Sequence, residues 1–289
     1  MIETAPAYAK INLSLDIVSK MADGYHNMKM VMQTVGLCDE ITVECVPGTG
    51  MYIDAGLPYL PGDGRNIAVK AAHAFFGYTG ISGILTRIRI KKNIPVCAGL
   101  GGGSADGACV LRILDKMFKT GLGPEVLKAI GGTVGSDVPF CVVGGTMLAE
   151  GKGDDLKRLP QIPRCHIVIC KPSFSCSTPE LFKNVRCDKI RTRPDTKGMI
   201  AALGVGDLKE IARRMYNVFE DVLPRGTRDI ADIKSLLFDN GALGAAMTGS
   251  GPAVFGVFDD NESARNACER LGKDFRECFL TETREMIID

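Results

Sequence analysis

The chain contains no tryptophan, has few other aromatic residues, and carries almost balanced charges. Aromatic residues make up 6% of its 289 residues, which argues against a surface that stacks nucleic-acid bases. A formal net charge of +1 gives no electrostatic reason to expect nucleic acid or an anionic membrane as a partner. We therefore expect neither partner.

The sequence also lacks any C-x-x-C pair, although it contains eleven cysteines. Its three histidines do not extend a cysteine pair into a zinc-binding pattern. Many cysteines stand in apolar runs, where a thiol behaves as a small hydrophobic group. The N-terminal segment carries Glu3, Lys10 and Asp16 and lacks the layout of a signal peptide. These features predict free thiols in the reducing cytoplasm.

The order of the predicted elements indicates an α+β protein. Alternating apolar residues over 9–17 and 84–91 predict strands, and another strand is predicted over 166–171. Periodicity of 3.6 residues predicts helices such as 65–76 and 207–223. The uncharged stretch Gly241–Phe258 is broken by glycines and Pro252, so we interpret it as two buried strands around a turn. A proline-containing linker near residue 160 predicts two domains, 1–160 and 161–289.

A glycine-rich loop is the most informative segment. Residues 99–108 read GLGGGSADGA, and a helical pattern follows them, with Ser104 at the expected N-cap. Glycines let the backbone approach a ligand closely, and a helix N-terminus offers unpaired N–H groups to an anion. The loop lacks the Gly-Lys-Ser/Thr ending of a P-loop, and it matches the G-x-G-x-x-G motif of dinucleotide-binding proteins poorly. It predicts a phosphate site, with a tight turn that holds no ligand as the alternative.

Three other segments carry polar residues in constrained settings. Lys10 and Asn12 project from the same face of the first strand, and Asp137 stands between a glycine-rich turn and a proline. Gly249 and Ser250 belong to a second glycine turn. Taken singly, each segment is as compatible with a structural role as with a functional one. The structural alternatives are a solvated charge at Lys10, an ordinary turn residue at Asp137 and a tight hairpin at Gly249.

Together these segments resemble the GHMP small-molecule kinases. Residues 95–108 and 247–255 resemble the second and third motifs of that family. The segments AKINL, DGYH, GSDVPF and TP, which contain Lys10, His26, Asp137 and Thr178, resemble one of its branches. That branch acts on an alcohol that carries a cytidine diphosphate. The resemblance runs from residue 5 to about residue 258.

The resemblance implies an N-terminal domain similar to domain 2 of ribosomal protein S5 and a ferredoxin-like C-terminal domain. It implies ATP-dependent phosphorylation of the 2-hydroxyl of an erythritol moiety, on the route to isoprenoid precursors. Asp137 would act as the catalytic base and Lys10 would orient it. Nucleotide-binding residues would be Asn66, Lys92, Pro95, Gly99, Leu100, Gly101, Gly102, Gly103, Ser104 and Ala105.

The resemblance also assigns the alcohol substrate and the metal. Tyr25 would stack on the cytosine ring and His26 would bond its polar edge. Asn12 and Thr178 would contact the diphosphate or the erythritol, together with Gly249 and Ser250. Mg²⁺ would accompany ATP, with Ser104 as its ligand.

The loop departs from the family pattern at two positions. Ala105 and Asp106 stand where the family has a serine and an asparagine, which removes one hydroxyl and adds a negative charge near the phosphates. The alternatives are another GHMP kinase, acting on homoserine, mevalonate or a sugar, and a nucleotide-binding regulator without catalysis. Both a monomer and a homodimer fit the sequence.

Overall fold

The computed structural model describes residues 1–223 and 228–288 and contains two β-sheets. The larger sheet has the strand order β3-β4-β2-β1-β8, with β5 pairing β2 and β6 pairing β5. Its members are β1 (Ile2–Lys20), β2 (His26–Pro47), β3 (Gly50–Asp54), β4 (Ile84–Lys91), β5 (Thr146–Gly151), β6 (Asp155–Arg158) and β8 (Tyr216–Asn217). The antiparallel pair of β1 and β2 forms its long centre.

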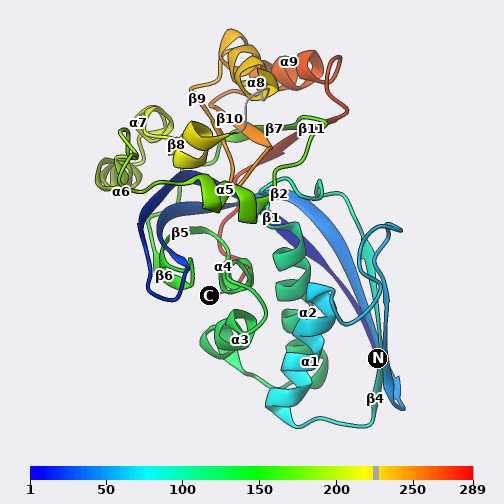
Figure 1. Cartoon of the computed structure of the whole chain (residues 1–289). Coiled ribbons are helices and arrows are strands. Elements are labelled where there is room, and N and C mark those ends of the chain that lie inside the picture. The colour runs from blue at the N-terminus through cyan, green and yellow to red at the C-terminus, as the bar shows by residue number, and fades with distance from the viewer. Residues whose placement is uncertain (224–227, 289) are drawn as a thin grey trace.

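Four helices cover one face of this sheet (Figure 1). They are α1 (Ile67–Thr79), α2 (Gly102–Phe118), α3 (Gly123–Gly132) and α4 (Val138–Val143). Helix α2 packs directly on β1 and β2, and apolar side chains such as Val110 and Leu114 are fully buried there. This packing fixes the start of α2, and therefore the glycine loop, against the middle of β1.

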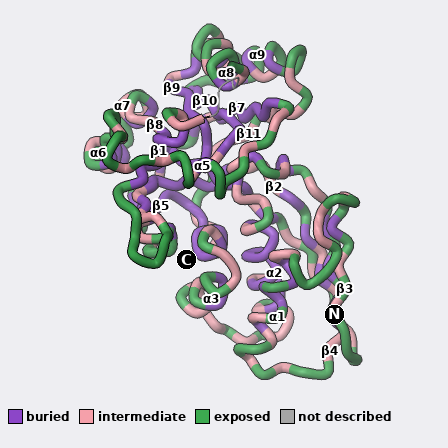
Figure 2. The backbone as a smooth tube through the Cα atoms, in the orientation of Figure 1, coloured by how far each residue is buried: buried purple, intermediate pink, exposed green. Residues whose placement is uncertain are grey.

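The smaller sheet has the antiparallel strand order β11-β7-β10-β9, which is the ferredoxin-like arrangement. Its strands are β7 (His166–Lys171), β9 (Gly244–Met247), β10 (Val254–Phe258) and β11 (Glu277–Glu282). Helices α8 (Arg228–Asp239) and α9 (Asn261–Leu271) pack on it, and Figure 2 shows its inner strands as buried. Both the α+β class and this topology were predicted, and both are confirmed.

The second half of the chain also returns to the larger sheet. Strand β8 pairs with β1, and the C-terminal segment forms bridges from Thr283 to Val35 and from Met286 to Gly144 (Figure 1). The backbone N–H of Ile287 donates to the carbonyl of Val143 at 2.7 Å. The boundary near residue 160 falls between β6 and β7 and remains a prediction, since later segments complete the larger sheet.

Several predicted elements coincide with the structure, and others need correction. Strands 84–91 and 166–171 are confirmed as β4 and β7. The glycine-rich sequence of 131–151 predicts an irregular segment. This prediction is wrong, because the segment holds α4 and β5, whose periodicity the glycines hide. The helix predicted over 207–223 is also wrong. It is split into α7 (Leu208–Arg213), β8 and the short 3₁₀ helix η1 (Val218–Val222).

Two further helices complete the chain, α5 (Thr178–Asn184) and α6 (Thr196–Val205). Helix α5 lies between the two sheets in Figure 1. Among the described residues, none of the helices has the length and apolar character needed to cross a membrane.

Candidate active site

A cavity of about 620 Å³ lies between the glycine loop, the start of α1 and the start of α5. The predicted nucleotide residues that line it are Asn66, Lys92, Pro95, Gly99, Leu100, Gly101, Gly102, Gly103 and Ser104. Thr178 and Ser250 line it as well. Ala105 does not, because it is buried and its N–H already donates to the carbonyl of Gly101 at 2.8 Å.

The glycine loop turns into α2 earlier than predicted. Helix α2 begins at Gly102, and its N-cap is Gly101 in the left-handed region, with φ of 69°. The prediction that Ser104 is the cap is therefore wrong, because a glycine at positive φ makes the turn and Ser104 lies in the first helical turn. The N–H groups of that turn have no partner within the helix and face an anion readily.

The two glycine turns interlock. Thr248 Oγ1 donates to the carbonyl of Gly99 at 3.3 Å, and the Ala253 N–H donates to the Ala98 carbonyl at 3.2 Å. A Cβ on Gly99 would lie 2.0 Å from the Thr248 carbonyl oxygen, and a Cβ on Gly249 would lie 2.8 Å from that of Gly99. The absence of side chains therefore lets a segment after β9 pack on the loop before α2.

Lys10 and Asp137 form an ion pair beside the glycine loop. Lys10 Nζ lies 3.6 Å from Asp137 Oδ2, and the side chains are 5% and 29% exposed. The Lys10 N–H donates to the carbonyl of Leu100 at 3.0 Å, which places the lysine against the loop. Asp137 is the residue before α4, and its carboxylate makes no capping hydrogen bond within the described structure. Its ion-pair partner in the described structure is Lys10, and neither residue is among those that line the cavity.

Asn12 lies beneath this pair rather than on an open surface. It is completely buried, its Oδ1 accepts from Lys10 Nζ at 2.7 Å, and its N–H donates to Thr248 Oγ1 at 3.1 Å. A buried ammonium needs such partners, since charge in a low dielectric is costly without them. This contact supports a positioning role for Asn12, exerted through Lys10.

Lys92 is held by two buried carboxylates. Its Nζ donates to Asp39 and, at 2.9 Å, to Asp106 Oδ2. Although burial opposes it, the charges of Asp106 and Asp39 raise the pKa of Lys92. Burial also raises the pKa of Asp106, against the opposing charge of Lys92. One ammonium thus serves two carboxylates and ties α2 to β2 and β4.

Replacing Lys92 with methionine is expected to destabilise the fold by about 3–5 kcal/mol, because Asp39 and Asp106 would be left buried without their cation. The measurement is the free energy of unfolding in urea. The matched control is Lys116→Met, which breaks an ion pair with Glu3 at a lysine that is 70% exposed. That change should cost less than about 1 kcal/mol. Equal losses in the two variants would contradict a structural role for Lys92.

Tyr25 and His26 lie at the turn between β1 and β2, away from the nucleotide cavity. The distance along β2 from Met32, which pairs with Asn12, to His26 is about 20 Å at about 3.3 Å per residue. Tyr25 is 61% exposed, and Lys152 Nζ lies 4.2 Å from the centroid of its ring. His26 stacks on Phe182 with ring centroids 4.9 Å apart. Burial, with the charge of Lys20, lowers the pKa of His26.

Helix α5 connects these two regions. At its start, Thr178 Oγ1 lies 2.6 Å from Ser250 Oγ, so the helix joins the second glycine turn at the cavity. One turn later, Phe182 packs against His26 and, edge to face, against Phe219. The structure thus brings the predicted residues together as two groups, with α5 alongside both.

The sequence analysis did not identify the residues that support the second glycine turn through hydrogen bonds. Asn217 is buried, and its Nδ2 donates to the carbonyls of Met247 and Gly249 at 2.8 Å. Glu220 accepts from the N–H of Met247 at 2.8 Å. Both stand in the segment predicted as one long helix, so no local signal marked them. Phe182 carried no signal either, because an aromatic residue on a helix usually belongs to the core.

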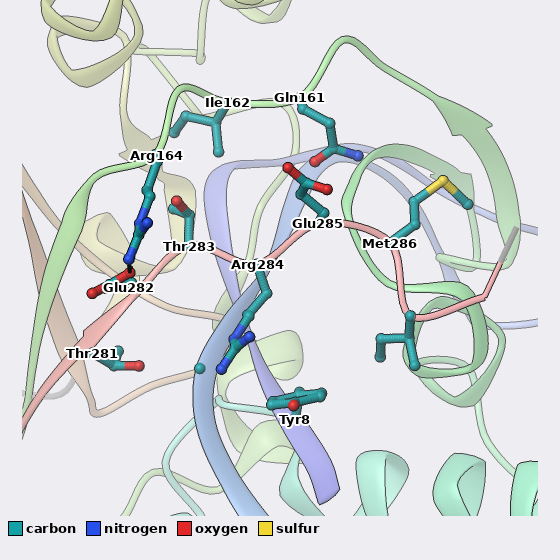
Figure 3. A pocket seen from close by; sticks show the side chains of 12 residues that line it. Tyr8, Gln161, Ile162, Arg164, Thr281, Glu282, Thr283, Arg284, Glu285 and Met286 are labelled. Carbon is teal, nitrogen blue, oxygen red and sulfur yellow. Dashed lines mark hydrogen bonds and ion pairs between the residues drawn. The ribbon is translucent and has the colours of Figure 1, made fainter.

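Another cavity, of about 810 Å³, lies beside the C-terminal segment (Figure 3). Tyr8, Arg164 and Arg284 line it, but none of the predicted site residues does. Three of its charged side chains are engaged within the chain, since Arg164 pairs with Glu282 at 2.7 Å and Arg284 lies over the Tyr8 ring. We therefore place the candidate active site at the smaller cavity.

Two family models match the chain. The GHMP kinases N terminal domain matches residues 66–145, and the GHMP kinases C terminal model matches residues 199–277. The first match contains the glycine loop and Asp137, and the second contains the interlocking glycine turn.

Relatives match over almost the whole chain. A 4-diphosphocytidyl-2-C-methyl-D-erythritol kinase of Clostridium botulinum is 43% identical, and the match covers 96% of this chain and 98% of the relative. A kinase of the same name from Caldicellulosiruptor bescii is also 43% identical, with 96% and 97% covered. A crystal structure of 4-(cytidine 5'-diphospho)-2C-methyl-D-erythritol kinase has a TM-score of 0.83 at 30% identity, with 97% and 99% covered. The chain therefore belongs to the GHMP kinase family, in the branch of the 4-diphosphocytidyl-2-C-methyl-D-erythritol kinases.

Proposed function

We propose that this enzyme transfers the γ-phosphoryl group of ATP to the 2-hydroxyl of 4-diphosphocytidyl-2-C-methyl-D-erythritol. This compound is named in the relatives, and the reaction belongs to isoprenoid precursor synthesis. The single observation that carries the proposal is the Lys10–Asp137 pair, held against a glycine loop that opens a helix. A base, a cation and a phosphate cradle are the parts that phosphoryl transfer requires.

The residues support a direct transfer. The amides of the glycine loop and of the first turn of α2 bind the phosphates, and the Lys10 ammonium offsets the charge that develops during transfer. The substrate hydroxyl gives its proton to Asp137 while its oxygen bonds to the γ-phosphorus. The bond to the bridging oxygen breaks, and ADP leaves. Asn12 keeps Lys10 directed at this point.

Magnesium neutralises phosphate charge in such reactions. Among the described residues, no group of three or more His, Cys, Asp or Glu is arranged to hold a metal ion by itself. Mg²⁺ in kinases is bound by few protein ligands, with phosphates and water completing the shell. The Ser104 hydroxyl lines the cavity at the first turn of α2, which fits this kind of site, and we propose it as a ligand.

The turn between β1 and β2 is proposed to bind the cytosine ring. The exposed Tyr25 ring offers a stacking surface, and stacking tolerates any base. A neutral imidazole at His26, favoured by its lowered pKa, offers one donor and one acceptor to the base edge. His26 should therefore contribute more than Tyr25 to the choice of base. Phe182, on α5, holds the imidazole in place.

The test is ADP release from ATP and Mg²⁺ with 4-diphosphocytidyl-2-C-methyl-D-erythritol, and in parallel with homoserine and mevalonate. We expect release with the cytidine compound alone. Release with another substrate instead would refute the proposed substrate and leave the protein a GHMP kinase. ATP binding without turnover of any substrate would favour the alternative of a nucleotide-binding regulator without catalysis.

Replacing His26 with alanine is expected to raise the KM for the cytidine substrate by about 10-fold or more, with a smaller change in kcat, because the lost contact lies far from the reacting atoms. Steady-state kinetics at saturating ATP measures both constants. His73→Ala, at an exposed position on α1, is the control and should leave both unchanged. An unaltered KM in His26→Ala would exclude base recognition there.

A further inference from the structure

A half-buried arginine on α2 reaches the end of the helix that follows Asp137. Arg112 Nη1 donates to the carbonyl of Cys141 at 2.6 Å and to that of Val142 at 3.4 Å, both on α4. Its Nη2 donates to the carbonyl of Pro6, on β1, at 3.5 Å. The guanidinium of one residue thus joins α2, α4 and β1.

These three elements carry the parts of the proposed active site. The glycine loop opens α2, Asp137 directly precedes α4, and Lys10 lies on β1. Among residues 1–223 and 228–288, no carboxylate forms an ion pair with Arg112, and the hydrogen bonds above all go to main-chain carbonyls. The cation therefore acts on the backbone of its neighbours.

Helix α4 has six residues, and its last four carbonyls need partners other than the bonds of a continuing helix. The carbonyl of Phe140 accepts from the Gly144 N–H at 2.8 Å, and that of Val143 accepts from the Ile287 N–H at 2.7 Å. The two carbonyls between them are those that Arg112 holds. A cation at this end also meets the negative end of the helix dipole. Arg112 therefore helps to fix where α4 lies along its axis.

The hydrogen bonds continue from this contact to Asp137. The N–H of Cys141, whose carbonyl accepts from Arg112, donates to the carbonyl of Asp137 at 3.1 Å. The Asp137 side chain makes no capping hydrogen bond, and its ion-pair partner is Lys10, at 3.6 Å. The backbone of α4 therefore places this carboxylate, and a displaced α4 would carry it away from Lys10.

Helix α2 is held in place without this arginine. It has 17 residues and packs on β1, β2 and α1, with Val110 and Leu114 fully buried. Loss of the Arg112 guanidinium should therefore move the short α4 and leave the glycine loop where it is.

We propose that Arg112 is a positioning residue for the phosphoryl transfer, which keeps Asp137 beside Lys10 and within reach of the substrate hydroxyl by fixing the end of α4. The inference rests on the proposed function for the role of Asp137 as the base. It gives Arg112 no contact with either substrate. The transfer is sensitive to such placement, because a displacement of about 1 Å can cost about 10²-fold in rate.

The first test compares two Arg112 variants with the wild-type protein in steady-state kinetics and in equilibrium ATP binding. Arg112→Met removes the three hydrogen bonds and should lower kcat by about 10²-fold. ATP affinity should stay unchanged, because the glycine loop stays in place. Arg112→Lys keeps a cation at the end of α4 and should recover about 10-fold of this loss, since an ammonium does not reproduce the planar fork.

Lys116→Met is the matched control. Lys116 lies one turn further along α2 and pairs with Glu3, on β1, at 2.7 Å. It thus ties the same helix to the same strand without the bonds to α4, and its loss should leave kcat at the wild-type value. Urea unfolding of each variant shows that it is folded under the conditions of the assay.

The second test needs no substrate. In the crystal structure of Arg112→Met, the distance from Lys10 Nζ to Asp137 Oδ2 should exceed about 4 Å, the limit of an ion pair. The wild-type distance is 3.6 Å. A role of Arg112 in overall stability alone would leave this distance unchanged.

A wild-type kcat in folded Arg112→Met would overturn the proposal, as would an unchanged distance between Lys10 and Asp137. A loss of ATP affinity as large as the loss of kcat would also overturn it, because Arg112 would then act on the glycine loop. Arg112→Lys provides the same readouts if the methionine variant does not fold. Failure of the proposed function would appear instead as no ADP release by the wild-type protein with the cytidine substrate, and the crystal structure would still decide whether Arg112 places Asp137.

Discussion

Asp137→Asn is expected to bind ATP normally and to lose turnover by about 10²- to 10⁴-fold, the usual contribution of a positioned general base. Asparagine keeps the shape of the side chain but accepts no proton at neutral pH. Asp137 does not cap α4, so the fold loses no hydrogen bond there among the described residues. Lys10 keeps its hydrogen bond to Asn12, which limits the cost of the missing ion pair.

Rapid-quench measurement of the chemical step would isolate this loss from product release, and ATP affinity is measured in parallel. Asp259→Asn, at an exposed position before α9, is the control for a change of charge and should turn over normally. Wild-type rates in Asp137→Asn would remove this residue from the base role. A loss of ATP binding would instead make it part of the nucleotide site.

Gly99→Ala is expected to destabilise the protein by about 2–5 kcal/mol, from backbone strain and overpacking together. Gly99 has φ of 78°, and a methyl group there would lie 2.0 Å from the Thr248 carbonyl oxygen. The two glycine turns would have to separate, which also displaces Asn12 and Lys10 through Thr248. ATP binding and turnover should therefore fall with stability.

Urea unfolding compares this variant with Gly103→Ala in the same loop. Gly103 lies within α2 and has no positive φ, and a Cβ there would lie 3.4 Å from the flexible end of Ile67. Alanine at this helical position should leave stability unchanged or raise it by up to about 1 kcal/mol. If both alanines cost the same, the tight contact with Thr248 is not what requires a glycine at position 99.

Local patterns were enough to locate most elements of this chain. Period-2 alternation located β4, an apolar run located β7, and the uncharged stretch around Pro252 was confirmed as β9, a glycine turn and β10. The order of these elements predicted the α+β class. The motif residues predicted the kinase family, because the glycine loop and the segments containing Lys10 and Asp137 are short and contiguous. Local sequence failed where distant partners decide the conformation. In the segment 207–223, predicted as one helix, α7 ends at Arg213 and Asn217 instead bonds to Met247 and Gly249.

The sequence by itself determined the family, and with it the residues that we propose carry the chemistry, since side-chain type and spacing depend only on the chain. Only the tertiary structure decided which contacts each of these residues makes. It turned Asn12 toward Lys10 and engaged Lys92 with two carboxylates. The physical reason is that hydrogen-bond partners and burial come from segments far apart in sequence. Whether a polar atom forms a hydrogen bond within the fold or stays available to a ligand therefore depends on how those segments pack.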